Sequence, residues 1–296
     1  MKKLLLCIAL LIGAPAGAEE LAANLFAAKT TPSFQQPTPV GSYGRGCAAG
    51  NVQLPETGPT WQAMRLSRNR NWGNPVMVAY LEELSAAATR FGWRGLYIGD
   101  IGNPRGGPMN SGHASHQMGL DADVWFLPPA SLSLSAAQRE KISSISIRTD
   151  DQLRVNGNYN SSYREILKAA ASDPRVDRIF VAAAIKLEIC KTATKADTSW
   201  LQRLRPEAGH QDHFHVRLKC PPGTGLCITQ KPTVAELSNN GNGCDATLNY
   251  WVTDYLHPPK PVKPVKPVKP QPPKKGPRQF TMADLPVQCA GILAAD

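Results

Sequence analysis

Histidine is scarce in this chain of 296 residues, and its distribution is the first sign of chemistry. Five of the six histidines fall in two short segments, "SGHASHQMGLDADVW" and "GHQDHFHVRLK". The first segment holds His113 and His116, and the second holds His210, His213 and His215. Imidazole nitrogens next to carboxylate oxygens are common zinc ligands, and imidazole also moves protons in catalysis. A single histidine usually has a structural role, but this concentration favours one shared metal centre.

The second segment reads as a β-strand over residues 213–218. Side chains alternate between the two faces of a strand, so His213, His215 and Arg217 share one face. The apolar side chains between them, Phe214 and Val216, share the other. The pattern predicts that one face packs in the core while the other presents two imidazoles in the same direction.

The first segment supplies the missing oxygen ligand. Gly119 interrupts the stretch between His116 and Asp123, which predicts a loop that runs into a strand near Asp123. His116, Asp123 and His215 would then offer two nitrogens and one oxygen to a Zn²⁺ ion, with a fourth position open for water. An open position is typical of a catalytic zinc site. Outer partners should fix the tautomers of the imidazoles, and Asp121, two residues from Asp123, is expected to face the same way as Asp123.

The same strand face indicates how such a site would work. Bound zinc lowers the pKa of water to about 7 and polarises a carbonyl group, which is the chemistry of peptide hydrolysis. His213, on the face of the ligand His215, is the candidate to take a proton from water or to stabilise an oxyanion. His210 is the second candidate for either role.

The elements that must position these residues are of mixed type. Asn74-Pro75 begins a helix over 75–91, and Gly92 ends it. Further strands are predicted at 95–99, 122–127 and 177–183, and further helices near 135–142, 162–171 and 197–204. No βαβ repeat is present, which favours an α+β fold with a central antiparallel sheet that carries the site, peripheral helices and long loops. Residues 19–60 are expected to be extended or loop.

The chain divides into four parts. Residues 1–18 form a signal peptide, with Lys2 and Lys3 before an apolar run and Ala16-Gly17-Ala18 as the cleavage site, so the protein is expected to be exported to the periplasm. The other parts are a zinc metallopeptidase domain at 19–256, a Pro/Lys-rich spacer at 257–278 and a C-terminal segment at 279–296. We predict no membrane span, because no later segment is long and apolar enough.

Cysteine usage agrees with export. Seven cysteines are present, and Cys7 lies in the signal peptide. An even number remains, which in an exported chain indicates disulfides. Cys220 and Cys227 can close a local loop around "PPGTGL", while the other pairings stay open. We expect one of them to tie Cys289, in the C-terminal segment, back to the domain.

The net charge of +10 does not indicate nucleic-acid binding. Residues 258–278 contain six lysines, one arginine and no acidic residue, so the basic charge belongs mainly to this stretch. Three tandem Pro-Val-Lys units favour an extended polyproline chain. Two interpretations remain: a solvated spacer, or a contact with a polyanionic cell wall or membrane surface.

These motifs resemble a known family. The pattern "SxHxxGxDxD" from Ser115 onward, together with the later "HxH", resembles the lysostaphin, D-Ala-D-Ala metallopeptidase and hedgehog-type zinc group. More narrowly, "LYIGDIGNPRGG", "GHASHQMGLDADV", "VDRIFVAAAIK" and "HVRLKCP" resemble the penicillin-insensitive murein endopeptidases of Gram-negative bacteria. The likeness covers most of the mature chain and includes its cysteines.

The resemblance implies particular roles for the histidines and aspartates. It implies that His116, Asp123 and His215 hold the zinc, that His113 also contacts metal, and that His213 assists catalysis with His210 nearby. It further implies a second metal at Asp150 with a histidine three residues later. This chain has Leu153 at that position, so one of the two ligands is missing.

The resemblance also implies disulfides and a substrate. The implied pairs are Cys47 with Cys289, Cys190 with Cys244, and Cys220 with Cys227. The implied substrate is the D-alanyl–meso-diaminopimelyl peptide cross-link of peptidoglycan. Three other functions stay open: a D-Ala-D-Ala carboxypeptidase, a non-catalytic zinc-containing wall-binding protein, and a polyanion binder that acts through the Pro/Lys stretch.

Overall fold

A six-stranded mixed sheet forms the centre of the structure, a computed structural model that describes residues 19–260 and 274–296. The inner strands pair antiparallel, whereas the pairs at both edges, β4 with β6 and β8 with β9, are parallel. The strands, in sheet order, are β4 (Trp61–Ala63), β6 (Leu96–Ile98), β7 (Asp121–Trp125), β10 (His213–Leu218), β8 (Val176–Val181) and β9 (Leu204–Pro206). The α+β class with an antiparallel centre is therefore confirmed, whereas the parallel pairs at the two edges were not predicted.

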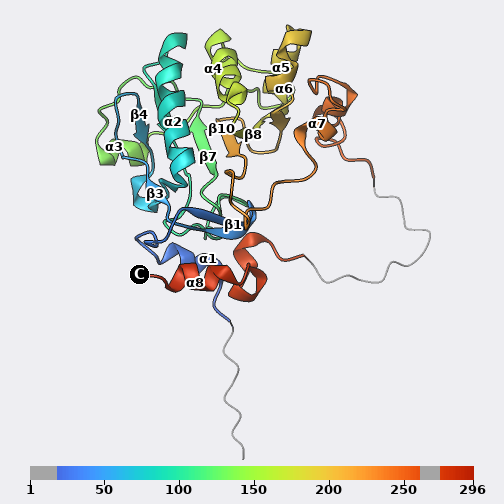
Figure 1. The fold of residues 1–296 in the computed structure, drawn as a ribbon. Coiled ribbons are helices and arrows are strands. Elements are labelled where there is room, and N and C mark those ends of the chain that lie inside the picture. Colours follow the sequence, from blue (N-terminus) through green and yellow to red (C-terminus); the bar gives the residue numbers. More distant parts are fainter. Residues whose placement is uncertain (1–18, 261–273) are drawn as a thin grey trace, which may run out of the picture.

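Helices cover one face of this sheet (Figure 1). The principal ones are α2 (Pro75–Ala88), α4 (Ser161–Ser172) and α5 (Ala183–Cys190). The Asn74 side chain caps α2 by accepting a hydrogen bond from the Val76 N–H at 3.1 Å, and Pro75 occupies the first turn. A 3-10 turn, η2 (Thr89–Phe91), follows α2 and ends at Gly92, whose φ is +86°.

The apolar core lies between these helices and the sheet. Phe214, Val216 and Leu218 of β10 are fully buried there, in one cluster with Met77 and Leu81 of α2. The expected alternation along β10 is confirmed, and it turns the histidines of this strand away from the helices.

A smaller base layer joins the two ends of the described chain. The helix α1 (Ala22–Ala27), the hairpin of β1 (Thr38–Ser42) and β2 (Arg45–Ala49), and the helix α8 (Gln288–Ala294) share a second apolar cluster (Figure 1). The disulfide between Cys47 and Cys289 connects β2 to α8 within it. The other two disulfides join Cys190 to Cys244 and Cys220 to Cys227. All three pairs match those that the family resemblance implied.

The remaining elements are short. They are β3 (Val52–Gln53), η1 (Leu66–Arg68), β5 (Trp72–Gly73), α3 (Ala136–Lys141), η3 (Lys195–Asp197), α6 (Thr198–Leu201), α7 (Val234–Leu237), η4 (Ala246–Val252), η5 (Pro277–Gln279) and η6 (Met282–Asp284).

Two local expectations differ from the structure. Residues 19–60 were expected to be extended or loop, which agrees with β1, β2 and β3 but not with the helix α1, whose apolar partners come from the distant residues 280–292. The helix expected at 197–204 ends at Leu201, and Leu204 already begins β9.

Within residues 19–260 and 274–296, no helix has the length and apolar character needed to cross a membrane. The predicted signal peptide, at 1–18, and residues 261–273 of the predicted spacer lie outside the described residues.

Candidate metal centre

The two histidine segments meet at the middle of the sheet. β7 and β10 are antiparallel neighbours, and Asp123 stands directly opposite His215 in their register. Directly opposed residues of an antiparallel pair have their side chains on the same face, about 5 Å apart. Asp123 thus lies in the middle of β7 rather than at its start, and the loop before β7 carries His113 and His116 to the same point.

Four imidazoles surround the Asp123 carboxylate. Nε2 of His116 and Nδ1 of His215 lie 3.4 and 3.5 Å from Asp123 Oδ1. Nδ1 of His113 lies 3.5 Å from Oδ2 of the same carboxylate. Nε2 of His213 is slightly farther, at 3.7 Å from Oδ1. The structure therefore brings together four of the histidines that the sequence singled out.

The other nitrogen of each ligand candidate is held by a neighbouring group. His116 Nδ1 lies 2.8 Å from the carbonyl oxygen of Ile101, to which it can donate a hydrogen bond. His215 Nε2 lies 2.9 Å from Asp121 Oδ1. Outer partners of this kind fix the ring and its tautomer in metal sites, and they leave the opposite nitrogen free as a ligand.

The same arrangement recurs at the two rings nearer to solvent. His113 Nε2 lies 3.0 Å from Asp100 Oδ2, and His213 Nδ1 lies 2.7 Å from Asp212 Oδ1. Asp100 and Ile101 follow β6, and neither was among the residues that the motifs singled out. The strand predicted at 95–99 was the one sequence signal for these two residues, because residues that directly follow a central strand can lie next to a site on that sheet.

The donor set fits a metal ion. His116 Nε2 and Asp123 Oδ1 are buried and have no hydrogen-bond partner in the described structure, which is costly for polar atoms unless another group satisfies them. One ligand atom from each of His113, His116 and Asp123 lies within 4.8 Å of the other two. A cation between them would satisfy both orphaned atoms. His215 is outside this group of three, but its Nδ1 reaches Asp123.

The loop that carries His116 requires unusual backbone angles. His116 itself has a φ of +67° and Gly119 a φ of +68°. A Cβ at position 119 would come within 2.5 Å of Asn51 Oδ1 and 2.7 Å of the Asn74 nitrogen, so only glycine fits. The His116 N–H donates to Asp121 Oδ2 at 3.0 Å, which ties the loop to β7.

The charge states of His215 and Asp123 suit ligands for a cation. Burial lowers the pKa of His215 to about 3, which keeps this imidazole neutral. Burial acts to raise the pKa of Asp123, but the surrounding His213, His116 and His113 outweigh it and hold this pKa well below the usual value. Neutral imidazole and ionised carboxylate are the forms that bind metals.

His210 and His213 lie at the edge of the cluster. Their ring centres are 5.0 Å apart, and His210 Nδ1 is 2.6 Å from the Ala208 carbonyl oxygen. Burial lowers the pKa of His213, but Asp123 and Asp212 outweigh this and raise it. Burial, followed by the neighbouring His213, lowers the pKa of His210 to about 4. The two rings therefore differ strongly in proton affinity.

Asp150 is not joined to this cluster by any hydrogen bond or ion pair among the described residues. It is exposed, in the turn between Arg148 and Gln152, and it is not part of the possible metal-binding group found among the described residues. Leu153, where a histidine ligand would be needed, is 42% exposed.

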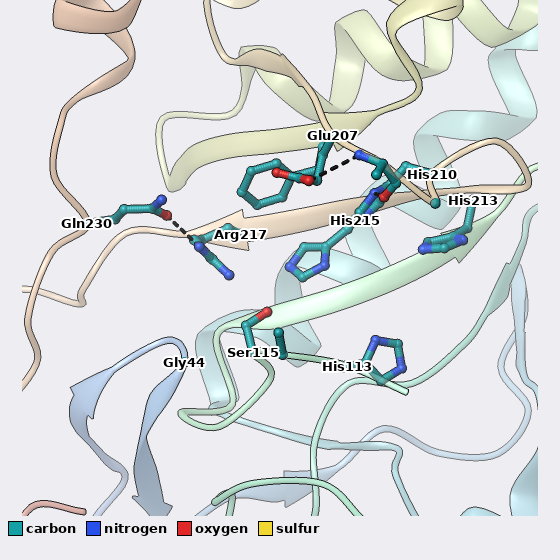
Figure 2. A pocket seen from close by; sticks show the side chains of 13 residues that line it. Gly44, His113, Ser115, Glu207, His210, His213, His215, Arg217 and Gln230 are labelled. Carbon is teal, nitrogen blue, oxygen red and sulfur yellow. Dashed lines mark hydrogen bonds between the residues drawn. The ribbon is translucent and has the colours of Figure 1, made fainter. Parts of the chain in front are cut away.

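Two cavities open on either side of the cluster. The larger, about 540 Å³, lies over the β10, β8 and β9 side and includes Phe180 and Glu207. Figure 2 shows His213, His215 and Arg217 along β10, with the loop of His113 facing them. The smaller, about 240 Å³, lies on the β6 and β7 side. Both include His113 and His213, so an extended ligand could cross the cluster from one cavity to the other.

Comparison with known proteins gives a consistent match. A family model described as penicillin-insensitive murein endopeptidase matches residues 39–294. A protein of that name from Haemophilus influenzae is 41% identical over 224 residues, which cover 76% of this chain and 75% of that protein. One from Klebsiella pneumoniae is 35% identical over 246 residues, 83% of this chain and 86% of that protein.

The similarity extends over nearly the full length in a third case. A penicillin-insensitive murein endopeptidase from Escherichia coli is 34% identical over 278 residues, 94% of each chain. These matches confirm the resemblance that the motifs indicated. Because the family model and the relatives both cover most of the sequence, this chain belongs to the penicillin-insensitive murein endopeptidase family.

Proposed function

We propose that this chain is a zinc-dependent murein endopeptidase that hydrolyses the D-alanyl–meso-diaminopimelyl cross-links of peptidoglycan. The observation that carries the proposal is the ring of four imidazoles around Asp123, in which each ring has its outer nitrogen held by a partner. Family membership supplies the substrate class, since the relatives carry that name.

We assign the metal to His116, Asp123 and His215, with Nδ1 of His113 as a third nitrogen beside them. Two nitrogens and one oxygen suit Zn²⁺ and leave a position for the reactants. When bound there, the ion supplies Lewis acidity, which polarises a peptide carbonyl and lowers the pKa of water to about 7. The assignment does not include Asp150, because it is exposed and lacks the second ligand that the family pattern requires.

His213 is the proposed proton carrier. Its Nδ1 is held by Asp212, so Nε2 points to the cluster, where it can accept a proton from attacking water and return it to the leaving amine. His210, whose Nδ1 donates to the Ala208 carbonyl oxygen, keeps a lone pair on Nε2 and is the second candidate to accept the proton.

The proposed location is the periplasm. The three disulfides are consistent with an exported protein, since such bonds persist in oxidising compartments. The sequence of residues 1–18 has the form of a signal peptide. Peptidoglycan is then both the partner and the substrate.

Digestion of purified muropeptides tests the proposal. Disaccharide-peptide dimers, incubated with the protein and analysed by mass spectrometry, should be converted to monomers, and chelator should stop the conversion. Monomers that end in D-Ala-D-Ala serve as the comparison, because their trimming in place of dimer cleavage would identify a carboxypeptidase. Dimer cleavage that continues in excess EDTA would exclude the zinc mechanism.

A further inference from the structure

The smaller cavity, beside the cluster, contains cationic side chains that the proposed mechanism does not use. It measures about 240 Å³, and its lining includes Arg65, Arg68, Trp125 and Ser143. It meets the larger cavity at His113 and His213, so it adjoins the point at which a peptide bond would be cut.

Its position in the sheet sets its relation to the substrate. Arg65 follows β4, Gly99 follows β6, and Trp125 lies on β7 two residues after Asp123, on the same face. The larger cavity is lined instead from β8, β9 and β10. A peptide that crosses the cluster would thus place one half of its scissile bond on each side of the β7–β10 pair.

Arg65 is the distinctive cation of this cavity. Among the described residues it forms no ion pair, whereas Arg68 and Arg70 both contact Asp100 Oδ2, at 3.1 and 3.0 Å. The Arg65 guanidinium stacks over the Trp125 ring at 5.4 Å, and its Nη2 donates to Ser143 Oγ at 3.2 Å. Its Nη1 also donates to the Arg139 carbonyl oxygen at 3.5 Å. A guanidinium has five N–H groups, so further N–H groups remain for a ligand.

The acidic residues of the same cavity are already engaged. Asp100 is shared by two arginines and His113, the Asp123 carboxylate faces the imidazoles, and Asp212 holds His213 Nδ1. None of them contacts Arg65 in the described structure. Among the described residues, the positive charge of Arg65 is therefore not offset by a carboxylate contact, whereas that of Arg68 is shared with Asp100.

The backbone is strained where it presents this side chain. Arg65 has a φ of +57° and Asn69 a φ of +50°, so left-handed residues flank both ends of η1. Non-glycine residues adopt this region at a cost, and such strain concentrates at functional sites. This observation agrees with a ligand-binding role for the segment that carries Arg65.

We propose that Arg65, assisted by Arg68, binds the carboxylate carried by the carbon next to the scissile nitrogen. This subsite rests on the proposed function. In a D-alanyl–meso-diaminopimelyl cross-link that carbon bears a free carboxylate, and a guanidinium binds a carboxylate through two parallel hydrogen bonds. The leaving amine half of the substrate then lies over β6 and β7, and the acyl half over β8 to β10.

Paired substrates and variants test the subsite. One dimer carries the free carboxylate and the other its primary amide. The wild type is expected to lose about 10- to 100-fold in kcat/KM on amidation, since hydrogen bonds to a charged group are of that strength. Arg65→Gln should show the same loss on the free dimer and little further loss on the amide. Arg65→Lys should fall between the two proteins.

Binding provides a second measurement that does not depend on turnover. Calorimetric titration of the full protein with the product monomer should give weaker binding of the amidated monomer to the wild type, and no such difference in Arg65→Gln. Arg94→Gln, a change of an exposed arginine outside both cavities, is the matched control.

The outcomes separate the two proposals. Equal losses of Arg65→Gln on both dimers, or a carboxylate preference that persists in this variant, would overturn the subsite while leaving the endopeptidase intact. A wild type that cleaves neither dimer would overturn the proposed function, and the product titration would then decide by itself whether the carboxylate is bound at Arg65.

Discussion

Nε2 of His215 on β10 lies 2.9 Å from Oδ1 of Asp121 on β7, and both side chains are buried. Asp121 also accepts the Arg217 Nε–H at 2.7 Å and the backbone N–H of His116 at 3.0 Å. Its carboxylate thus holds β10 and the loop before β7 in one arrangement. Because His215 donates Nε2–H to Asp121, its Nδ1 carries the free lone pair that faces Asp123.

Asp121→Asn is expected to weaken zinc binding by about 10- to 100-fold, the usual effect of losing an outer partner of a metal ligand. An amide offers one oxygen where three N–H groups now converge, so one donor loses its acceptor. Competition with a chelator measures the affinity. Asp254→Asn, at an exposed position, is the control and should leave the affinity unchanged.

Replacement of His213 by alanine should have a different effect from replacement of His215. His215→Ala should lose zinc and activity together. His213→Ala should keep zinc and lose about 10²- to 10⁴-fold in kcat, which is typical for removal of a general acid or base. Metal analysis of both purified variants, with steady-state kinetics, separates the roles. Full zinc content with full activity in His213→Ala would exclude it as the proton carrier.

Removal of the metal should lower stability as well as activity. A ligand that binds only the folded state stabilises it by about 2.7 kcal/mol at 100 times its Kd. The zinc-free protein should therefore melt at a lower temperature, with the disulfides intact, and added zinc should restore both properties. Unchanged melting after complete chelation would contradict a metal held by buried ligands.

Lys186 should make the stability depend on pH. Burial, followed by the nearby Arg205, lowers the pKa of Lys186 to about 7, whereas an unfolded lysine titrates near about 10.4. Between these values the unfolded chain holds a proton that the folded chain has released, so stability rises with pH, by up to about 1.4 kcal/mol per unit. Below pH 7 this gain is absent.

Lys186→Met should remove that slope. Urea unfolding of both proteins between pH 6 and 9 measures the difference in their free energies of unfolding. The free energy of unfolding of the wild type should rise relative to that of the variant as the pH rises. The exposed Lys191→Met, at the end of the same helix, is the control. A difference that stays constant over this range would mean that Lys186 is charged throughout.

The sequence predicted those parts of the site that depend on local pattern. The alternation at 213–218 placed His213 and His215 correctly, since strand periodicity alone decides it. The partners Asp100 and Ile101 could not be found in this way, because they become neighbours only when β6 pairs with β7. Arg65 was missed because an arginine in the sequence does not reveal that its backbone will adopt a left-handed conformation.

The fold shows the same division. The helix at 75–88 was predicted from its cap, its apolar stripe and Gly92, all of which are local. α1 and the β1–β2 hairpin were not, because Phe280, Leu285 and Ile292 complete their packing from the far end of the chain. The parallel pairs at the edges of the sheet could not be predicted either, because the sequence of a short strand does not show in which direction its neighbour runs.

Because Asp123 pairs directly with His215, the centre should tolerate insertions in an exposed turn but not within the strands β7 and β10. Residues could be added or removed in the largely exposed turn at 151–154 without moving a ligand, provided that β7 and β10 still pair in the same register. A single residue inserted after His213 would turn His215 inward and leave phenylalanine beside the carboxylate. Insertion scanning should therefore show tolerance at 151–154 and loss of activity for insertions within β7 or β10.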